Sequence, residues 1–128
     1  DVCSSDLTDE FPAFYSTSSG LSVDWKVDCA EEVVDIAKHQ WGLGIQSAIL
    51  VVVPPPAETA LPFEEVENYI QEAVREAQRQ HIHGAMLTPF LLAKMNELTS
   101  GKSLNTNLDL LKNNARVAAL IASAFAAK

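Results

Sequence analysis

Residues 103–125 read SLNTNLDLLKNNARVAALIASAF and carry more structural information than any other stretch of the chain. Ser103 is expected to cap a helix that runs to about residue 126. At about 100° per residue, one broad arc of this helix is apolar. The residues on that arc are Leu104, Leu108, Leu110, Leu111, Ala115, Val117, Ala118, Ile121 and Ala122. The arc is expected to face the core of the protein.

Two asparagines interrupt this apolar arc. Asn107 and Asn114 lie seven residues apart and about 20° from each other around the helix, whereas Asn113 projects to the polar side with Asp109 and Arg116. A primary amide in a core face costs about 1–3 kcal/mol if it is unpaired, so Asn107 and Asn114 need partners. The partner is either the backbone of another helix or a polar ligand, and the spacing leaves both open. Because amides do not titrate, such residues bind and orient ligands but do no acid–base work.

Two further helices are expected immediately upstream. One begins with Thr88 as cap and Pro89 as first residue and ends at Gly101. The other begins near Pro62 and has apolar residues at helical spacing: Val66, Tyr69, Ile70, Ala73, Val74 and Ala77. Gly101-Lys102-Ser103 lacks both the earlier glycine and the strand of a nucleotide-binding P-loop, so it is interpreted as a turn between helices.

The N-terminal half shows strand patterns. Residues 21–27 alternate apolar and polar side chains, and residues 47–53 form a β-branched run that three prolines end. Between them, Asp28 and Glu31 form a capping box for a helix to about Leu43. The order strand, helix, strand, helix predicts an α/β fold, a partial α/β/α layered sheet with strands in the N-terminal half and helices dominating the C-terminal half. So few strands indicate that the sheet is incomplete.

Composition narrows the class of protein. The chain has 128 residues, a net charge of −8 and 48% apolar residues, which is typical of a single globular domain. The acidic balance argues against nucleic acid or an anionic membrane as a partner, and no apolar run approaches the ~20 residues of a membrane-spanning helix. Cys3 and Cys29 form no CxxC pair, which favours a reducing compartment and a cytoplasmic location.

The first seven residues, DVCSSDL, resemble the translation of a sequencing-library adapter. Residues 1–7 are therefore expected to be non-native and excluded from fold reasoning. Residues 8–128 are then expected to be the C-terminal part of a single larger domain.

The residues by themselves offer no catalytic or metal-binding constellation. His81 and His83 lack further ligands nearby and are interpreted as a helix terminus. The paired glutamates at 31–32 and 64–65 fall in first helical turns, where they complement the helix dipole. No catalytic residue and no metal ligand is assigned.

Several motifs together resemble the C-terminal signature of pseudouridine-5′-phosphate glycosidases. They are Thr88-Pro89-Phe90-Leu91-Leu92, Glu97-Leu98-Thr99-x-Gly101, Ser103-Leu104-x-x-Asn107 and Asn113-Asn114-Ala115. Residues 8–19, around Phe11-Pro12-Ala13-Phe14, resemble the segment that leads to the Ser-Gly region of that family. The similarity runs over residues 8–128 in unbroken order.

This resemblance implies an α/β enzyme, typically a homotrimer, that reversibly splits pseudouridine 5′-phosphate into uracil and ribose 5-phosphate. It also implies an imine-forming lysine, an acidic residue and a divalent metal, usually manganese. None of these maps onto this segment, because Lys26, Lys38, Lys94, Lys102 and Lys112 match no nucleophile motif. Two positions depart from the family pattern: residues 53–56 read VPPP, and Ala85 stands where some members have a lysine.

The resemblance carries over Asn107 as a substrate-contacting residue, with Asn114 and Asn113 as its neighbours. The chain alone is expected to be inactive, because the covalent chemistry belongs to the preceding part of the enzyme. Two alternatives stay open: a non-enzymatic α/β binding or assembly module, and a related enzyme for another phosphorylated nucleoside or sugar.

Overall fold

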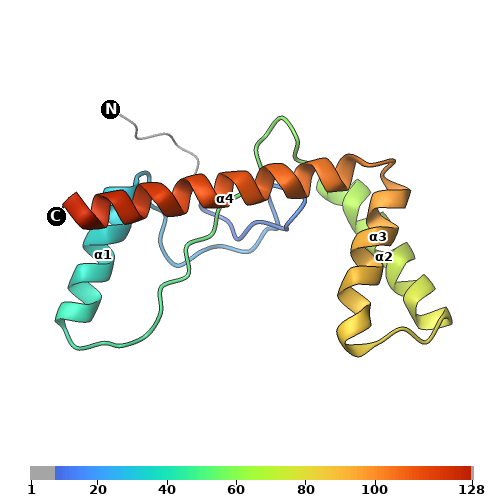
Figure 1. Cartoon of the computed structure of the whole chain (residues 1–128), viewed down its shortest axis with the longest axis horizontal. Helices are drawn as coiled ribbons and strands as arrows, with labels where there is room; N and C mark the ends of the chain where they lie inside the picture. The colour runs from blue at the N-terminus through green and yellow to red at the C-terminus, as the bar shows by residue number, and fades with distance from the viewer. Residues whose placement is uncertain (1–7, 128) are drawn as a thin grey trace.

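A computed structural model of the chain describes residues 8–127, and helices make up most of it (Figure 1). The segment 1–7, set apart by its sequence, lies outside the described residues. The elements are α1 (Ala30–Gly42), α2 (Phe63–Arg79), the short 3₁₀ helix η1 (Gly84–Met86), α3 (Leu87–Leu98) and α4 (Lys102–Ala127).

The longest helix, α4, joins two groups of elements that do not otherwise pack together. Figure 1 shows α1 beside the C-terminal end of α4, and α2 with α3 beside its N-terminal end. Among the described helices, α1 packs only on α4, and α2 reaches α4 only through α3. At the α1 end, the Phe125 ring lies 6.0 Å from the Trp41 ring and 5.3 Å from the Lys38 ammonium. The arrangement therefore depends on α4 remaining one continuous helix.

The predicted α/β layering is wrong. In the described part of the chain, residues 21–27 contribute only Ser22 to an isolated antiparallel bridge with Glu10, and residues 47–53 form no strand. Residues 48–53 make no backbone–backbone hydrogen bond to any other described residue. A strand exists only if a neighbouring strand completes its ladder, and β-branched composition reports only a local preference. No such neighbour faces this run within residues 8–127, so it remains extended chain beside α4.

The helices lie close to their predicted positions, but different residues cap them. The predicted Asp28–Glu31 box is replaced by a bond in which the Asp28 amide donates to Glu32 at 2.7 Å, and Cys29 is the N-cap. Before α3, η1 shifts the helix start from the predicted Pro89 to Leu87.

The predicted cap Ser103 instead lies inside the first turn of α4. Its amide donates to the Thr99 hydroxyl at 3.0 Å, and that hydroxyl donates to the Met95 carbonyl at 2.7 Å. Thr99 thus joins the end of α3 to the start of α4. Gly101 has a φ of 87°, which glycine adopts readily, and this agrees with the interpretation of Gly101-Lys102-Ser103 as a turn between helices.

The main core cluster lies between α2, α3 and the chain before α1. Tyr15, Val66 and Met95 are buried together, with Leu61, Tyr69 and Ile70 packed around them. Two hydrogen bonds fix Tyr15 in register with the segment before α2: the Leu61 amide donates to the Tyr15 carbonyl, and the Ser16 hydroxyl donates to the Leu61 carbonyl, each at 2.8 Å. Residues 45 positions apart in the sequence are therefore held side by side.

A buried hydroxyl fastens α4 to the loop before α2. The Thr106 hydroxyl bonds with the Thr59 carbonyl and, at 3.1 Å, with the Lys102 carbonyl of its own helix. Thr106 is almost fully buried, so the Thr59 carbonyl depends on this contact.

We expect Thr106→Val to lower the free energy of unfolding by about 1–3 kcal/mol, because the near-isosteric valine leaves the Thr59 carbonyl unpaired. Urea unfolding followed by circular dichroism measures the change. Ser123→Ala, which removes an exposed hydroxyl from the same helix, serves as the matched control. Equal midpoints for the two variants would contradict the anchoring role.

The Tyr15 phenol should make the fold sensitive to alkali. Burial raises the pKa of Tyr15 above its ordinary value, and a hydrogen bond with Ser103 opposes the shift only in part. Below about pH 10 the phenol is protonated in both the folded and unfolded states, so it adds no pH dependence. As the pH rises through the raised pKa, stability is lost because only the unfolded chain ionises freely. In Tyr15→Phe, thermal melts across this range should show a smaller alkaline loss; identical losses would contradict the assignment.

Candidate functional site

One of the predicted site residues, Asn114, lines a groove between α4 and two extended segments. The groove has a volume of about 510 Å³. Its walls are residues 11–14, residues 51–53 and one face of α4, including Leu110, Val117 and Ile121. Among the described residues that line it, Asn114 is the polar side chain in an otherwise apolar surface. A ligand in this groove would therefore meet apolar walls and one amide.

The three asparagines occupy different environments. Asn113 is half-buried and donates from Nδ2 to the Pro54 carbonyl at 3.4 Å, while its Oδ1 accepts from Arg116 at 3.0 Å. Asn107 is half-buried, and Asn114 is exposed at the groove. None of the side-chain hydrogen bonds between described residues involves Asn107 or Asn114. Asn113, predicted to face the polar side, is thus the one fastened to the loop.

The buried face of α4 is also narrower than the predicted apolar arc. Ser103, Thr106, Leu110 and Val117 are its buried residues. By contrast, Leu104, Leu108 and Leu111 are exposed. At about 100° per residue, Asn107 and Asn114 lie between this buried face and the exposed leucines. Their amides are therefore free to pair with groups outside the described residues.

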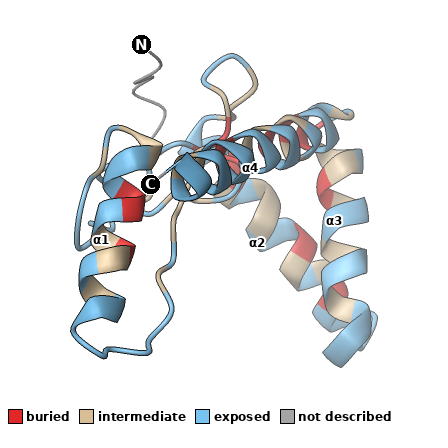
Figure 2. Cartoon of the chain, turned by 60° about the vertical axis from the view of Figure 1, so that its left-hand side comes forward, coloured by how far each residue is buried: buried red, intermediate tan, exposed pale blue. Residues whose placement is uncertain are grey.

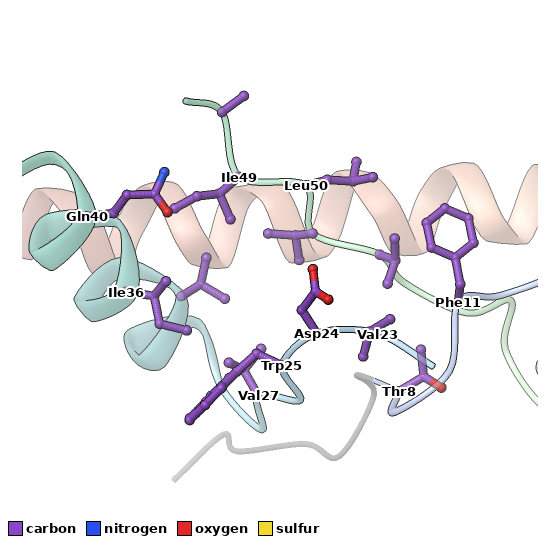
Figure 3. A pocket seen from close by; sticks show the side chains of 14 residues that line it. Thr8, Phe11, Val23, Asp24, Trp25, Val27, Ile36, Gln40, Ile49 and Leu50 are labelled. Atoms are coloured by element: carbon purple, nitrogen blue, oxygen red, sulfur yellow. The ribbon is translucent and has the colours of Figure 1, made fainter. Parts of the chain in front are cut away.

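A second hollow, of about 460 Å³, opens between residues 21–27, α1 and residues 48–52 (Figure 3). Its walls are mainly apolar, from Val23, Val27, Val33, Ile36 and the valine-rich run. In Figure 3 the Asp24 carboxylate points from the first extended segment toward the second. Gln40 closes one end, where its Nε2 donates to the Ser47 carbonyl at 2.9 Å.

The sequence analysis singled out neither Asp24 nor Gln40. Asp24 occupies a polar position in an alternating run, and Gln40 lies among polar helix residues, so no local pattern marks either. Among the described residues that line the hollow, Asp24 is the one carboxylate and Thr8 the one hydroxyl. This arrangement can enclose an apolar group but lacks the paired groups that general acid–base catalysis uses.

A carboxylate also organises the turn that follows the Phe-Pro-Ala-Phe segment. Glu10 Oε2 accepts hydrogen bonds from the Ser18 hydroxyl at 2.5 Å and from the amides of Gly20 and Ser19 at 3.0 and 3.1 Å. The Ser18 hydroxyl and then the Gly20 and Ser19 amides lower the pKa of Glu10, because they stabilise its charged form. Sequence reasoning did not identify this cluster, since Glu10 and residues 18–20 come together only when the turn closes.

The histidines fall outside these sites. His81 and His83 line a separate shallow pocket with Met86 and Phe90 near η1. Within residues 8–127, no group of three or more His, Cys, Asp and Glu side chains is placed to hold a metal ion. None of the described helices is long and apolar enough to cross a membrane.

Comparison with protein families gives one clear match. The model for the family described as "Indigoidine synthase A like protein" matches residues 1–124. Among curated proteins, the pseudouridine-5′-phosphate glycosidase of Petrotoga mobilis is 46% identical over 118 residues, covering 92% of this chain and 39% of that protein. The protein of the same name from Caldanaerobacter subterraneus is 50% identical over 115 residues, covering 90% of this chain and 38% of the relative. The resemblance inferred from the motifs is thereby confirmed, and the chain spans about two-fifths of the length of these relatives.

Solved structures show the same arrangement of the backbone. An indigoidine synthase A-like protein from Thermotoga maritima, 35% identical, superposes with a TM-score of 0.79 over 90% of this chain and 37% of its own. The prealnumycin C-glycosynthase, crystallised with ribulose 5-phosphate, gives a TM-score of 0.82 at 24% identity, over 94% of this chain and 39% of its own. At that identity the second likeness concerns the fold alone.

Replacing Asn113 should affect the free energy of unfolding more than replacing Asn114. We expect Asn113→Ala to lower the free energy of unfolding by about 0.5–1.5 kcal/mol, because it removes the bond to the Pro54 carbonyl. We expect Asn114→Ala to change it by less than about 0.5 kcal/mol, because that side chain is exposed. Urea unfolding of the two variants tests the difference, and a larger loss for Asn114→Ala would reverse the assignment.

Proposed function

The chain belongs to the family of indigoidine synthase A like proteins, and we propose that it forms part of a pseudouridine-5′-phosphate glycosidase. The reaction proposed for the whole enzyme is the reversible cleavage of the carbon–carbon glycosidic bond, which yields uracil and ribose 5-phosphate. The observation that carries this proposal is the identity of 46–50% to two glycosidases over at least 90% of the chain.

Within that enzyme, we propose that this segment binds substrate and does none of the covalent chemistry. Asn107 stands in the Ser-Leu-x-x-Asn motif, half-buried, on the α4 face beside the groove. Asn114 is the polar side chain lining that groove, and Asn113 holds the neighbouring loop through Pro54. Primary amides both donate and accept hydrogen bonds, which suits the hydroxyl and carbonyl groups of a ribose and a uracil.

The covalent steps require groups that this segment lacks. Breaking a carbon–carbon bond needs an electron sink, and an imine between a lysine and the opened sugar provides one. Lys26, Lys38, Lys94, Lys102 and Lys112 lie in no matching motif. We therefore propose that the lysine and the acid come from the part of the enzyme that this chain does not match. The described residues do not fit a metal site, and we derive no metal-dependent step from them.

The metal, the oligomeric state, the cellular location and the substrate are properties of the whole enzyme. We propose a manganese-dependent homotrimer in the cytoplasm, acting on a small phosphorylated nucleoside. These attributes rest on the resemblance to the glycosidase family.

A chimaera tests the proposed role of Asn107. In it, this chain replaces the 115 matched residues of the Caldanaerobacter subterraneus relative. We expect the chimaera to release uracil from pseudouridine 5′-phosphate and the 128-residue chain alone to release none. We expect Asn107→Ala to lower kcat/KM of the chimaera about 10- to 100-fold, the effect of losing one hydrogen bond to a polar ligand.

Asn105→Ala provides the matched control, because Asn105 is an exposed asparagine of the same helix at a position that the motif leaves unspecified. It should leave kcat/KM unchanged within about twofold, as is usual for an exposed position without contacts. Equal losses in the two variants would refute a substrate contact at Asn107. A chimaera that folds but releases no uracil would refute the proposed activity.

A further inference from the structure

The outward face of α4 carries a second apolar row. We call it the outer seam and define it as Leu104, Leu108, Leu111, Ala115, Ala118 and Ala122. Successive members are alternately four and three residues apart, the spacing of the a and d positions at which one helix packs on another. Leu104, Leu108 and Leu111 are 48%, 46% and 56% exposed, and the three alanines are exposed as well.

The outer seam is distinct from the face that builds the described fold. Taking about 100° per residue, its members lie within about 40° of Leu104, whereas the buried Ser103, Thr106, Leu110 and Val117 centre about 130° away. Figure 2 shows the exposed surface continuing along the outer side of α4, with the buried residues turned inward. Helices that are apolar on two faces are typically buried on both of them.

Side-chain size along the outer seam indicates what kind of surface covers it. The leucines occupy the N-terminal half and the alanines the C-terminal half. The distance between packed helices follows the size of the side chains at the contact. A covering helix must therefore lie farther from α4 at the leucine end and closer at the alanine end, or carry small residues opposite the leucines and large ones opposite the alanines.

We propose that the outer seam is the surface on which an apolar helix from the remainder of the glycosidase domain packs. This inference rests on the proposed function, because it takes the chain as part of that domain. The solved neighbours contain this backbone arrangement within chains of which it makes up only 37% and 39%. They therefore carry much polypeptide that can lie against α4.

A second copy of this chain is the weaker occupant. Large apolar side chains are also exposed outside α4, notably Trp25, Leu43 and Leu50. Two copies packed seam to seam would leave these uncovered. The remainder of a domain, being larger than the segment itself, can cover the outer seam and these side chains together.

The test compares one substitution in two settings. Leu108 is exposed in the chain alone, so Leu108→Glu should change the Tm of the 128-residue chain by less than about 2 °C. In the chimaera with the Caldanaerobacter subterraneus relative, the same glutamate would be buried without a partner, and we expect the Tm to fall by about 5–10 °C. Leu111→Ala, a milder change, should lower the Tm of the chimaera by about 3–6 °C if the glutamate variant does not fold.

Leu120→Glu is the matched control, since Leu120 lies on the same helix, is 38% exposed and projects about 160° away from Leu104. It should affect the chain and the chimaera equally. Equal changes in Tm on Leu108→Glu in the chain alone and in the chimaera would overturn the proposal. A chimaera without any substitution that fails to fold would overturn it as well. A dimer of the chain alone that Leu108→Glu dissociates would also overturn it, in favour of a second copy. Uracil release by the chimaera reports on the proposed function separately from these Tm differences.

Discussion

The attachment of α4 to the loop before α2 is the constraint on which the rest of the molecule depends. The Thr106 hydroxyl bonds with the Thr59 carbonyl, and the Asn113 amide with the Pro54 carbonyl. These contacts fix where one long helix lies against an extended segment that forms no sheet within residues 8–127. Because α1 and α3 each pack against a different end of α4, their mutual placement follows from that one helix.

The two sides of α4 explain why a stretch so rich in apolar residues buries so few of them. Its inward side supplies Leu110 and Val117 to the groove, while Leu104, Leu108 and Leu111 face outward. Apolar residues that face water contribute little to stability, since the hydrophobic effect acts only on area removed from water. The described fold therefore depends strongly on polar anchors and on small core clusters.

Position on α4 also separates structural asparagine from candidate ligand-binding asparagine. Asn113 is engaged with the backbone of a neighbouring loop, whereas Asn107 and Asn114, between the groove and the outer seam, make no side-chain hydrogen bond to another residue in 8–127. An unpaired amide beside apolar surface is suited to a partner that supplies polar groups. In the proposed enzyme that partner is the substrate, while the electron-sink chemistry comes from elsewhere in the domain.

The sequence alone determined the helices, the turn at Gly101 and the family, because helical periodicity, glycine conformation and motif order are local properties of the chain. It misplaced the caps by one or a few residues: Glu32 rather than Glu31 accepts from the Asp28 amide, and Ser103 is not a cap, because its own amide donates to the Thr99 hydroxyl. The strand that the sequence predicted at residues 47–53 is absent from the structure, because β-branched composition cannot reveal whether a neighbouring strand is present. Only the tertiary structure decided that Asn113 faces the Pro54 loop and that Asn114 opens onto the groove. It also decided that Leu104, Leu108 and Leu111 remain exposed. Each of those outcomes depends on segments tens of residues away, and no local pattern specifies where such segments will lie.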